Sequence, residues 1–427
     1  MDGNRNMKEE YISVADALTA VLHSVSPLPP ETVALTDALD RILAEPVVAG
    51  DSLPPFANSA MDGYAVRAAD VAQASREQPA NLRVVADIAA GVVVDVVLSP
   101  GTAARIMTGA PLPAGADAIV PVEGTDEAYR AAERPLPDQI AIYRRVEPGE
   151  YVRHIGEDIE AGQEVLPAGH QLRPQEIGVL ASLGVAQVPV IRRPRVGILS
   201  TGDELIAVES PLTPGKIRNS NSYTQIAQIE VLGAVPVPLG VARDTVADVR
   251  TRLQAGLEAG VDLFISSAGV SVGAYDVVRT VLEEGGNIGF WKVRMRPGKP
   301  LAHGTYQGVV YLGLPGNPVS AMVSFERFAR PAILKMAGHT QLERPQVTAV
   351  LRDEIHSDGR ESYVRAVVER NGTGEYYIAT TTGSQGSHMM TSLVKANALL
   401  IVPEGVKFVP SGTHLSAMMI DWPSTVF

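Results

Sequence analysis

Short apolar runs alternate with helical patterns between residues 195 and 337, and this alternation constrains the fold more than any other feature. The apolar runs, at about 195–200, 235–240, 262–267, 288–294 and 308–314, are predicted to be strands. Helical patterns lie between them at about 221–232, 245–259 and 276–285, and a long helix is predicted from 318 to about 336. Thr245 with Asp248 resembles a capping box. Such alternation is typical of a doubly wound, mainly parallel sheet with helices on both faces.

The regions before and after this segment have sequence patterns typical of β-structure. Between residues 51 and about 165, short Val-rich runs alternate with Pro and Gly turns, and they predict strands of an all-β module. The runs are Val84–Val85, Val92–Leu98, Ala118–Val122 and Ile140–Tyr143. After Gly338, short strands and turns again predominate, which predicts a small β-barrel or sandwich.

Composition limits the kind of partner. The net charge of −12 argues against nucleic acid or an acidic membrane surface, so an anionic substrate would need a local cluster of cations. The sequence contains no cysteine, which excludes thiolate metal sites and fits a reducing compartment. No stretch reaches the ~18 apolar residues of a membrane span, and no signal-type core follows the polar first residues. A cytoplasmic protein is therefore expected.

Loops rich in Gly, Pro and polar residues follow the predicted strands. Loops at the carboxyl ends of strands in an open α/β sheet gather at one edge, where ligands bind. These loops carry two cations and several carboxylates, and they predict a site for an anionic ligand and a metal ion. They are Ser200–Glu204, Ala268–Asp276, Arg296–Pro300 and Leu314–Pro318.

Each of these motifs also has a purely structural interpretation. Asn317 and Pro318 suit the N-cap and first position of a helix, so they serve either a helix start or a phosphate that approaches Gly316. Asp276 is either a helix cap or a magnesium ligand, and Ser271 in the preceding loop adds a hydroxyl donor.

The charged residues near these loops are open to the same two interpretations. Arg296 and Lys299 on a stiff Pro-Gly turn favour an oxyanion site, although such a strand face is commonly only solvated. The acids that follow strands could cap helices, or together with Asp276 they could converge on one cation. These acids are Asp203, Glu204 and Asp244.

Taken together, the motifs resemble those of the molybdopterin molybdenumtransferase (MoeA) family, which is similar to the E domain of gephyrin. The matching stretches follow the family's order along nearly the whole chain. They are FANSAMDGYAV (56–66), RIMTGAPLPAGADAIV (105–120), GEDI (156–159), STGDEL (200–205), GVSVGAYD (269–276), RPGKP (296–300) and GLPGNPVSA (313–321).

The resemblance implies an architecture and a reaction. Residues 8–29 and 191–338 would form the α/β domain, 30–50 and 165–190 a linking domain, 51–164 an inserted β domain and 339–427 a C-terminal β domain. Such enzymes insert molybdenum from molybdate into adenylylated molybdopterin and release AMP, with Mg²⁺. The dithiolene sulfurs belong to the pterin, so a protein without cysteine is chemically adequate. A homodimer is implied, as is transient contact with the adenylyltransferase and with molybdoenzymes.

The resemblance also assigns roles to residues. Asp276 would be the acid that is tied to Mg²⁺ and to anhydride cleavage, with Asp244 and Glu204 nearby. Arg296 and Lys299 would hold oxyanions. The substrate-binding set would comprise Ser271, Thr108, Asp158, Asn58, Ser59, Pro315, Asn317, Pro318, Arg365 and Ser387. The loop near Asn58 and Ser59 would reach the partner's site.

Three positions depart from the family pattern, and two other functions stay open. Ala57 replaces a frequent aspartate, Arg296 a frequent lysine and Ala268 a common glycine. The alternatives are the adenylyltransferase that precedes this step and a carrier or scaffold that binds molybdopterin without turnover.

Overall fold

The chain divides into two compact units. The computed structural model describes residues 11–127, 135–267 and 275–421, with the backbone alone for Tyr275 and Asp276. Unit 1 comprises the described residues of Met1–Thr32, Asp40–Ala44 and Pro189–Phe427, and unit 2 comprises those of Val33–Leu39 and Glu45–Val188. The finer division into four domains stays a prediction.

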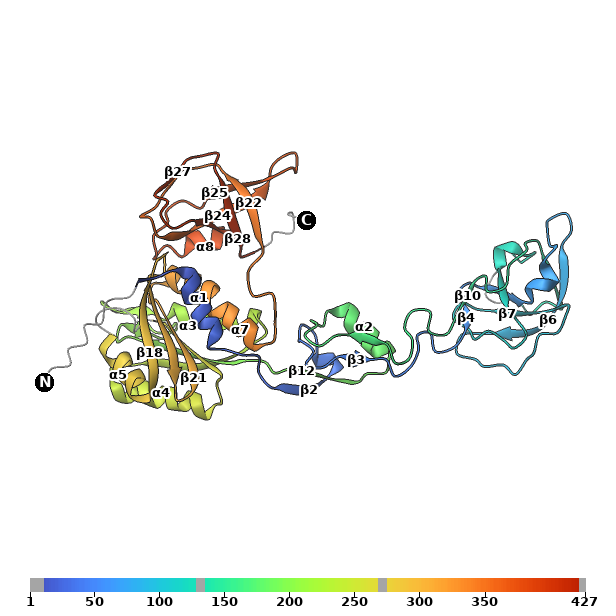
Figure 1. Ribbon diagram of the computed structural model, residues 1–427, viewed down its shortest axis with the longest axis horizontal. Coiled ribbons are helices and arrows are strands. Elements are labelled where there is room, and N and C mark those ends of the chain that lie inside the picture. Colours follow the sequence, from blue (N-terminus) through green and yellow to red (C-terminus); the bar gives the residue numbers. More distant parts are fainter. Residues whose placement is uncertain (1–10, 128–134, 268–274, 422–427) are drawn as a thin grey trace. The chain divides into compact units, whose positions relative to one another are not determined.

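A seven-stranded sheet forms the centre of unit 1 (Figure 1). The predicted strands are present, and neighbours β16–β13–β17–β21 run parallel. The sequence did not predict β20, which pairs antiparallel with both β18 and β21. In spatial order the strands are β1 (Tyr11–Ile12), β18 (Gly286–Val293), β20 (Pro300–Tyr306), β21 (Val309–Leu314), β17 (Leu263–Ser267), β13 (Arg195–Thr201) and β16 (Val235–Ala242).

Helices cover both faces of this sheet because its strands are apolar on both sides. Val196 and Ile198 of β13 share one core with α1 and α7, whereas Leu199 shares the opposite core with α4 and α5. This is the predicted doubly wound arrangement. The helices are α1 (Val14–His23), α3 (Ser220–Val231), α4 (Val246–Glu258), α5 (Tyr275–Gly285), α6 (Pro318–Ser324) and α7 (Arg330–Met336).

The predicted single helix from 318 to about 336 is interrupted. A π-helical turn, η4 (Phe325–Ala329), separates α6 from α7. Pro331 lacks the N–H that an uninterrupted α-helix would direct to the carbonyl of Arg327, and a wider turn accommodates this loss.

The C-terminal part of unit 1 is a closed five-stranded β-barrel, as predicted. The ring closes because β24 pairs with both β25 and β26. The short strand β19 (Met295–Arg296) pairs with β24 and thereby joins the barrel to the α/β part. The barrel strands are β22 (Gln346–Leu351), β24 (Glu361–Arg370), β25 (Tyr377–Thr381), β26 (Ala398–Val402) and β28 (His414–Met419). Smaller elements of this C-terminal part are β23 (Ile355–His356), β27 (Phe408–Val409) and α8 (Thr391–Lys395), and those of the α/β part are β14 (Leu205–Ile206) and β15 (Ile217–Arg218).

Unit 2 is built mainly of strands. Its five-stranded sheet has the order β8-β5-β7-β6-β9 and carries separate apolar cores. The sheet strands are β5 (Gly63–Val66), β6 (Ala80–Ile88), β7 (Thr102–Ile106), β8 (Ala118–Pro121) and β9 (Gln139–Ile142). Further elements are β3 (Val47–Val48), β4 (Asn58–Ser59), β10 (Val152–Arg153), β11 (Glu164–Leu166) and α2 (Pro174–Ser182), while β2 (Pro30–Ala34) and β12 (Gln187–Ile191) include the unit boundaries.

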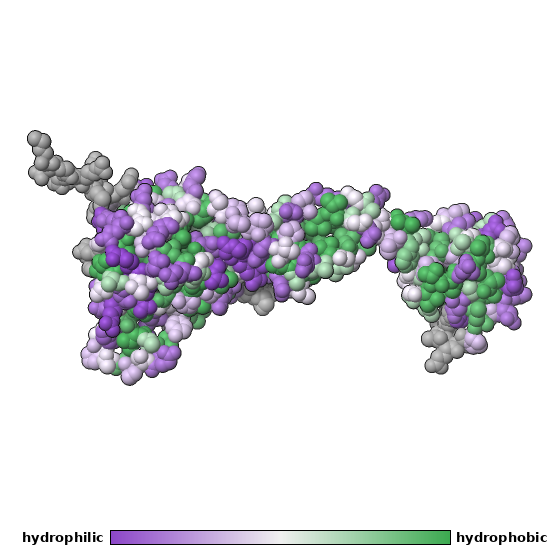
Figure 2. Space-filling view, turned by 90° about the horizontal axis from the view of Figure 1, so that it is seen from below, coloured by the Kyte–Doolittle hydropathy of each residue, from purple (hydrophilic) through white to green (hydrophobic). Residues whose placement is uncertain are grey.

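The predicted strand at Val92–Leu98 is wrong. Within this run the structure has only an isolated bridge from Val97 to Ala114, and Val93 is 87% exposed. Apolar areas interrupt the polar surface of unit 2 in the space-filling view (Figure 2). Among the described residues, no helix combines the length and apolar character needed to cross a membrane.

Candidate active site

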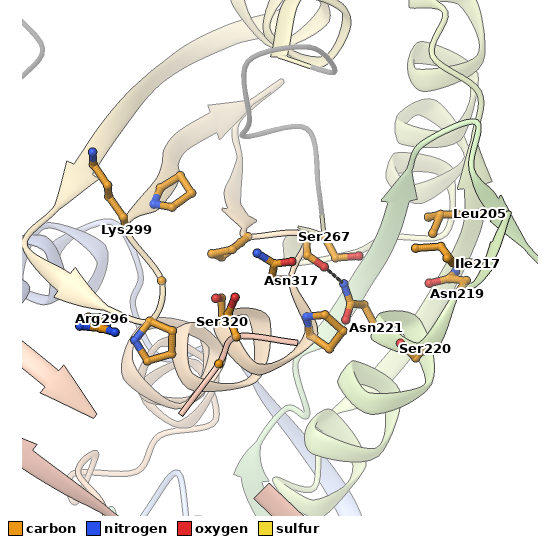
Figure 3. A pocket seen from close by; sticks show the side chains of 18 of the residues that line it. Leu205, Ile217, Asn219, Ser220, Asn221, Ser267, Arg296, Lys299, Asn317 and Ser320 are labelled. Atoms are coloured by element: carbon orange, nitrogen blue, oxygen red, sulfur yellow. Dashed lines mark hydrogen bonds between the residues drawn. The ribbon is translucent and has the colours of Figure 1, made fainter. Parts of the chain in front are cut away.

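A cavity of about 620 Å³ lies in unit 1 where three of the four predicted loops meet (Figure 3). The loops that follow the parallel strands β13 and β21, together with Ser267 at the carboxyl end of β17, supply one part of its lining, as expected for an open α/β sheet. The loop between β19 and β20 and two loops of the C-terminal barrel supply the rest. The lining includes Glu204, Arg218, Asn219, Asn221, Ser267, Arg296, Lys299, Pro315, Gly316, Asn317, Pro318, Ser320, Arg360, Gln385 and Ser387.

The cavity is locally basic despite the acidic chain. Its described lining contains the basic residues Arg218, Arg296, Lys299 and Arg360, with Glu204 as its only acid. This local excess of positive charge is what the sequence required for an anionic ligand.

Asp358 pairs differently with two of the three arginines that line the cavity, Arg360 and Arg296. Its carboxylate accepts hydrogen bonds from Arg360, including Nε at 3.1 Å, and Arg360 also donates to the carbonyl of Met295 at 3.1 Å. The Arg360 guanidinium lowers the pKa of Asp358 to about 2. Arg296 lies 3.7 Å from the same carboxylate, a long ion pair. Arg360 is therefore held in place, whereas the more loosely paired Arg296 can meet an oxyanion.

The turn between Arg296 and Lys299 depends on Gly298. This residue has φ +107°, and an added Cβ would lie 2.5 Å from Oγ of the buried Ser324. Only glycine fits such a backbone this close to a neighbouring helix. The close packing fixes the turn that presents both cations to the cavity.

Hydrogen bonds also fix the opposite wall. Asn219 begins α3, and its side-chain oxygen accepts from the N–H of Ser222 at 3.3 Å and from Ser200 Oγ at 3.2 Å. Asn221 Nδ2 donates to the carbonyl of Gly316 at 2.8 Å, so α3 anchors the loop that precedes α6. Asn317 is the N-cap residue of α6 and Pro318 is its first residue, as predicted, but the Asn317 side chain makes no capping hydrogen bond. That amide is therefore available to a ligand in the cavity.

Glu204 supplies the carboxylate of the lining. Gly202 lies under it with φ +140°, and an added Cβ there would lie 2.5 Å from Glu204 Oε2. Magnesium is commonly bound by one or two protein carboxylates together with substrate phosphates. Among the described lining residues Glu204 is therefore the carboxylate that could take part in holding such an ion. Within the described chain, however, no three His, Asp or Glu side chains converge as a complete metal site.

Sequence and structure comparisons identify the relatives of this chain. Three family models match in order: the MoeA N-terminal region (domain I and II) at residues 12–184, a probable molybdopterin binding domain at 197–335 and the MoeA C-terminal region (domain IV) at 348–419. Molybdopterin molybdenumtransferase 2 of Mycobacterium tuberculosis is 42% identical over 96% of this chain and 98% of its own length. The chain belongs to the molybdopterin molybdenumtransferase (MoeA) family.

Other relatives agree with this membership. The molybdopterin molybdenumtransferase of a Nostoc species is 41% identical over 91% of this chain and 88% of its own length. A crystal structure of the molybdopterin biosynthesis MoeA protein from Pyrococcus horikoshii is 31% identical, has a TM-score of 0.78 and covers 96% of this chain and 100% of its own.

The structure brings many of the predicted MoeA-type site residues together. The members that line the cavity are Glu204, Arg296, Lys299, Pro315, Asn317, Pro318 and Ser387. Asp244 lies outside this lining, at the loop after β16, where its N–H donates to Asp203 Oδ1 at 3.3 Å. Ser271 and the side chain of Asp276 lie outside the described residues; the backbone places Asp276 in the first turn of α5.

Arg365 is placed behind the cavity wall. It is 1% exposed, and its guanidinium donates to Ser392 Oγ at 3.0 Å and to the carbonyl of Gly386 at 3.1 Å. Burial, and secondly the charge of Arg296, lower the pKa of Arg365 to about 10. Arg365 supports the Gln385–Ser387 loop and borders, with Arg296, a smaller cavity of about 150 Å³.

The other predicted residues lie in unit 2. Thr108 donates to Asp62 Oδ1 from its backbone N–H at 2.7 Å and from Oγ1 at 2.9 Å. Asn58 and Ser59 are buried in β4, and Ser59 Oγ donates to the carbonyl of Met61 at 2.5 Å. Asp158 is exposed, and its N–H donates to the carbonyl of Leu53 at 3.0 Å.

Sequence reasoning missed several polar residues of the cavity. They are Arg218, Asn219, Asn221, Ser267, Arg360 and Gln385. Asn219 had a local signal, since an Asn followed by Ser-Asn-Ser at the start of a helical pattern is a typical cap. Arg360 had none, because its place in the site depends on the pairing of β19 with β24.

Proposed function

We propose that this protein inserts molybdenum from molybdate into adenylylated molybdopterin and releases AMP, in a Mg²⁺-dependent reaction. Its family membership makes it a transferase of molybdenum cofactor biosynthesis. The proposal adds the adenylylated substrate, the molybdate donor, the magnesium ion and the released nucleotide.

The basic cavity carries this proposal. Arg296, Lys299 and Arg360 line one cavity of a chain whose net charge is −12. Small and amide side chains of the matched molybdopterin-binding region line the same cavity. A molybdate dianion and a phosphoanhydride both require such a cluster of donors. Because the chain has no cysteine, the soft sulfur ligands for molybdenum come from the pterin dithiolene.

The proposed roles follow from the position of each group. Arg296, with its loose ion pair, and Lys299 bind oxyanion oxygens, and Ser387 adds a donor from the barrel loop. Pro315, Asn317 and Pro318 shape the pocket for the pterin nucleotide, and Arg365 keeps the Gln385–Ser387 loop in place. Ser271 and the four residues of unit 2 are proposed as further substrate contacts; the latter are Asn58, Ser59, Thr108 and Asp158.

Glu204, Asp276 and Asp244 are the proposed holders of the magnesium ion. When bound, Mg²⁺ supplies charge neutralisation at the anhydride oxygens as AMP leaves. Asp276 is proposed as the acid that orients the cleaved anhydride. We further propose a cytoplasmic homodimer that exchanges its substrate and product with the adenylyltransferase and with molybdoenzymes.

The reaction is tested with purified protein, adenylylated molybdopterin, Mg²⁺ and molybdate, by measuring AMP and molybdenum-loaded pterin. We expect molybdate-dependent AMP release that Lys299→Met and Asp276→Asn each strongly reduce. Lys395→Met, which changes an exposed lysine of α8, is the matched control. Tight pterin binding without AMP release would instead indicate a carrier, and synthesis of adenylylated pterin from ATP would indicate the adenylyltransferase.

A further inference from the structure

Tyr11 lies beside the lysine of the cavity although the two are far apart in the sequence. The Nζ atom of Lys299 is 5.3 Å from the centroid of the Tyr11 ring. The Nζ atom of Lys292 lies 5.8 Å from the same centroid. Both distances are within the range of about 6 Å in which an aromatic face attracts a cation.

Strand pairing and hydrogen bonds fix the backbone of Tyr11 beside Lys292. Strand β1 pairs parallel with β18, and this register sets Tyr11 opposite Lys292. The N–H of Arg294 donates to the carbonyl of Ile12 at 2.8 Å, and Arg294 Nη1 donates to the carbonyl of Tyr11 at 3.4 Å. Tyr11 is 49% exposed and belongs to the edge strand of the sheet, where its ring lies near the ammonium groups of both lysines.

A neighbouring aromatic ring can limit the positions that the Lys299 ammonium adopts. Its side chain extends away from Asn317 and Ser320, on the same side of the cavity as Arg296 (Figure 3). A lysine has a flexible four-carbon stem and loses much rotamer freedom when a ligand orders it. The turn at Gly298 fixes where the stem begins, and the Tyr11 ring restricts where the ammonium ends.

We propose that Tyr11 is a positioning residue for Lys299, whose ring keeps the ammonium ordered at the mouth of the cavity before an oxyanion arrives. The inference rests on the proposed function in taking Lys299 as an oxyanion contact. Ordering a flexible side chain in advance removes part of the entropic cost of binding, and loss of this effect should weaken oxyanion affinity by about 2- to 10-fold.

The first test measures the affinity of the full-length protein for molybdate by equilibrium dialysis. Tyr11→Leu should weaken binding by about 2- to 10-fold, whereas Tyr11→Phe, which keeps the aromatic face, should remain within about twofold of the wild type. Tyr223→Leu is the matched control, because Tyr223 is similarly exposed, at 53%, and does not line the cavity. Equal affinity for the wild type and Tyr11→Leu, or tighter binding by Tyr11→Leu, would overturn the proposal.

A double-mutant cycle tests whether Tyr11 acts through Lys299. In a Lys299→Met background, Tyr11→Leu should have no further effect on molybdate affinity. The same loss in both backgrounds would show that Tyr11 acts by another route, and the proposal would then be wrong.

A chemical measurement separates this inference from the proposed function. Labelling by an amine-selective reagent, followed by peptide mass spectrometry, should be faster at Lys299 in Tyr11→Leu than in the wild type, relative to the exposed Lys395. If the wild type binds no molybdate, the proposed function fails, and faster labelling would still support the contact. Unchanged labelling of Lys299 would overturn the positioning role in either case.

Discussion

Two asparagines that begin helices of the site differ in what their side chains do. Asn219 caps α3 through a hydrogen bond from Ser222, whereas the Asn317 side chain makes no capping hydrogen bond to α6. We expect Asn219→Ala to cost about 1 kcal/mol of stability and Asn317→Ala only a few tenths. Under the proposed function, Asn317→Ala should lower the rate of AMP release by about 5- to 10-fold, the effect of one lost hydrogen bond.

Urea unfolding and the AMP assay measure these two effects separately. Asn317→Asp keeps the size of the side chain but replaces its N–H donors with a negatively charged oxygen, so it should lower the rate of AMP release at least as much as Asn317→Ala. If Asn317→Ala were as destabilising as Asn219→Ala, the side chain would have a structural role that the hydrogen bonds do not show.

His303 is a second residue of interest, because its protonation should affect the stability of unit 1. Its Nε2 atom lies 3.0 Å from Ser24 Oγ, and the Ser24 hydroxyl already donates to the carbonyl of Val21. Nε2 therefore carries the proton of the neutral ring and donates to Ser24. Trp291 packs against this ring at a tilt of 44° with centroids 5.0 Å apart, and burial lowers the pKa of His303 to about 4.

The lowered pKa predicts a loss of stability in acid. Between pH 6.5 and pH 4 the unfolded chain binds a proton at this histidine that the folded protein excludes, so folding weakens as the pH falls. This group should make unit 1 about 2 kcal/mol less stable at pH 5 than at pH 8. His303→Gln keeps a donor to Ser24 but cannot titrate, so urea unfolding should show a smaller difference between the two pH values. An identical pH dependence in the variant would contradict the assignment.

Site residues were predictable from the sequence where a strand, a loop and a helix follow one another. Arg296, Lys299 and Asn317 belong to such local units, and the structure places all three at one cavity. Arg360 and its partner Asp358 were not predictable, because they reach the cavity through a strand pairing between distant segments. A local pattern indicates which side chains follow a strand, but not which remote loop will cover them.

At the scale of the elements, the predicted capping box at the start of helix α4 is only partly present. Thr245 caps it, as expected, with Oγ1 3.3 Å from the N–H of Asp248. The Asp248 carboxylate, however, accepts from the N–H of Arg243 at 2.7 Å instead of closing a reciprocal box with Thr245. Thr245→Ala should therefore cost about 1 kcal/mol in urea unfolding, and Thr245→Ser, which keeps the accepting oxygen, should cost much less. Equal losses in both variants would assign the effect to the methyl group instead.

The same limit of local patterns explains which elements were predictable. Runs that alternate with helices gave β13, β17 and β21 with nearly correct bounds, because both faces of these strands are buried. Strand β20 escaped prediction, since its segment Pro300–Tyr306 contains His303, Gly304 and Thr305 and looks like a loop. Val92–Leu98 has strong strand propensity but pairs only through Val97, so its tertiary surroundings outweighed its composition.

At the scale of the whole molecule, the two units have separate apolar cores. Ile119 of β8 is 0% exposed in a core made only of unit 2 residues, and Leu312 of β21 is 0% exposed in a core of unit 1. Stability need not be uniform in such a chain, since cooperative units tend to coincide with separately packed cores. A damaged core should then loosen its own unit first.

Matched core truncations test this independence. Ile119→Ala and Leu312→Ala each remove buried methyl groups and should destabilise their own unit by about 2–5 kcal/mol. Hydrogen exchange followed by mass spectrometry should show faster exchange across unit 2 in the first variant and across unit 1 in the second, with the other unit unchanged. If either truncation accelerated exchange equally in both units, the chain would unfold as one cooperative body, and the cavity of unit 1 would depend on the packing of unit 2. If the units respond separately, unit 2 variants at Thr108 or Asp158 can be tested for activity without concern that they unfold the cavity.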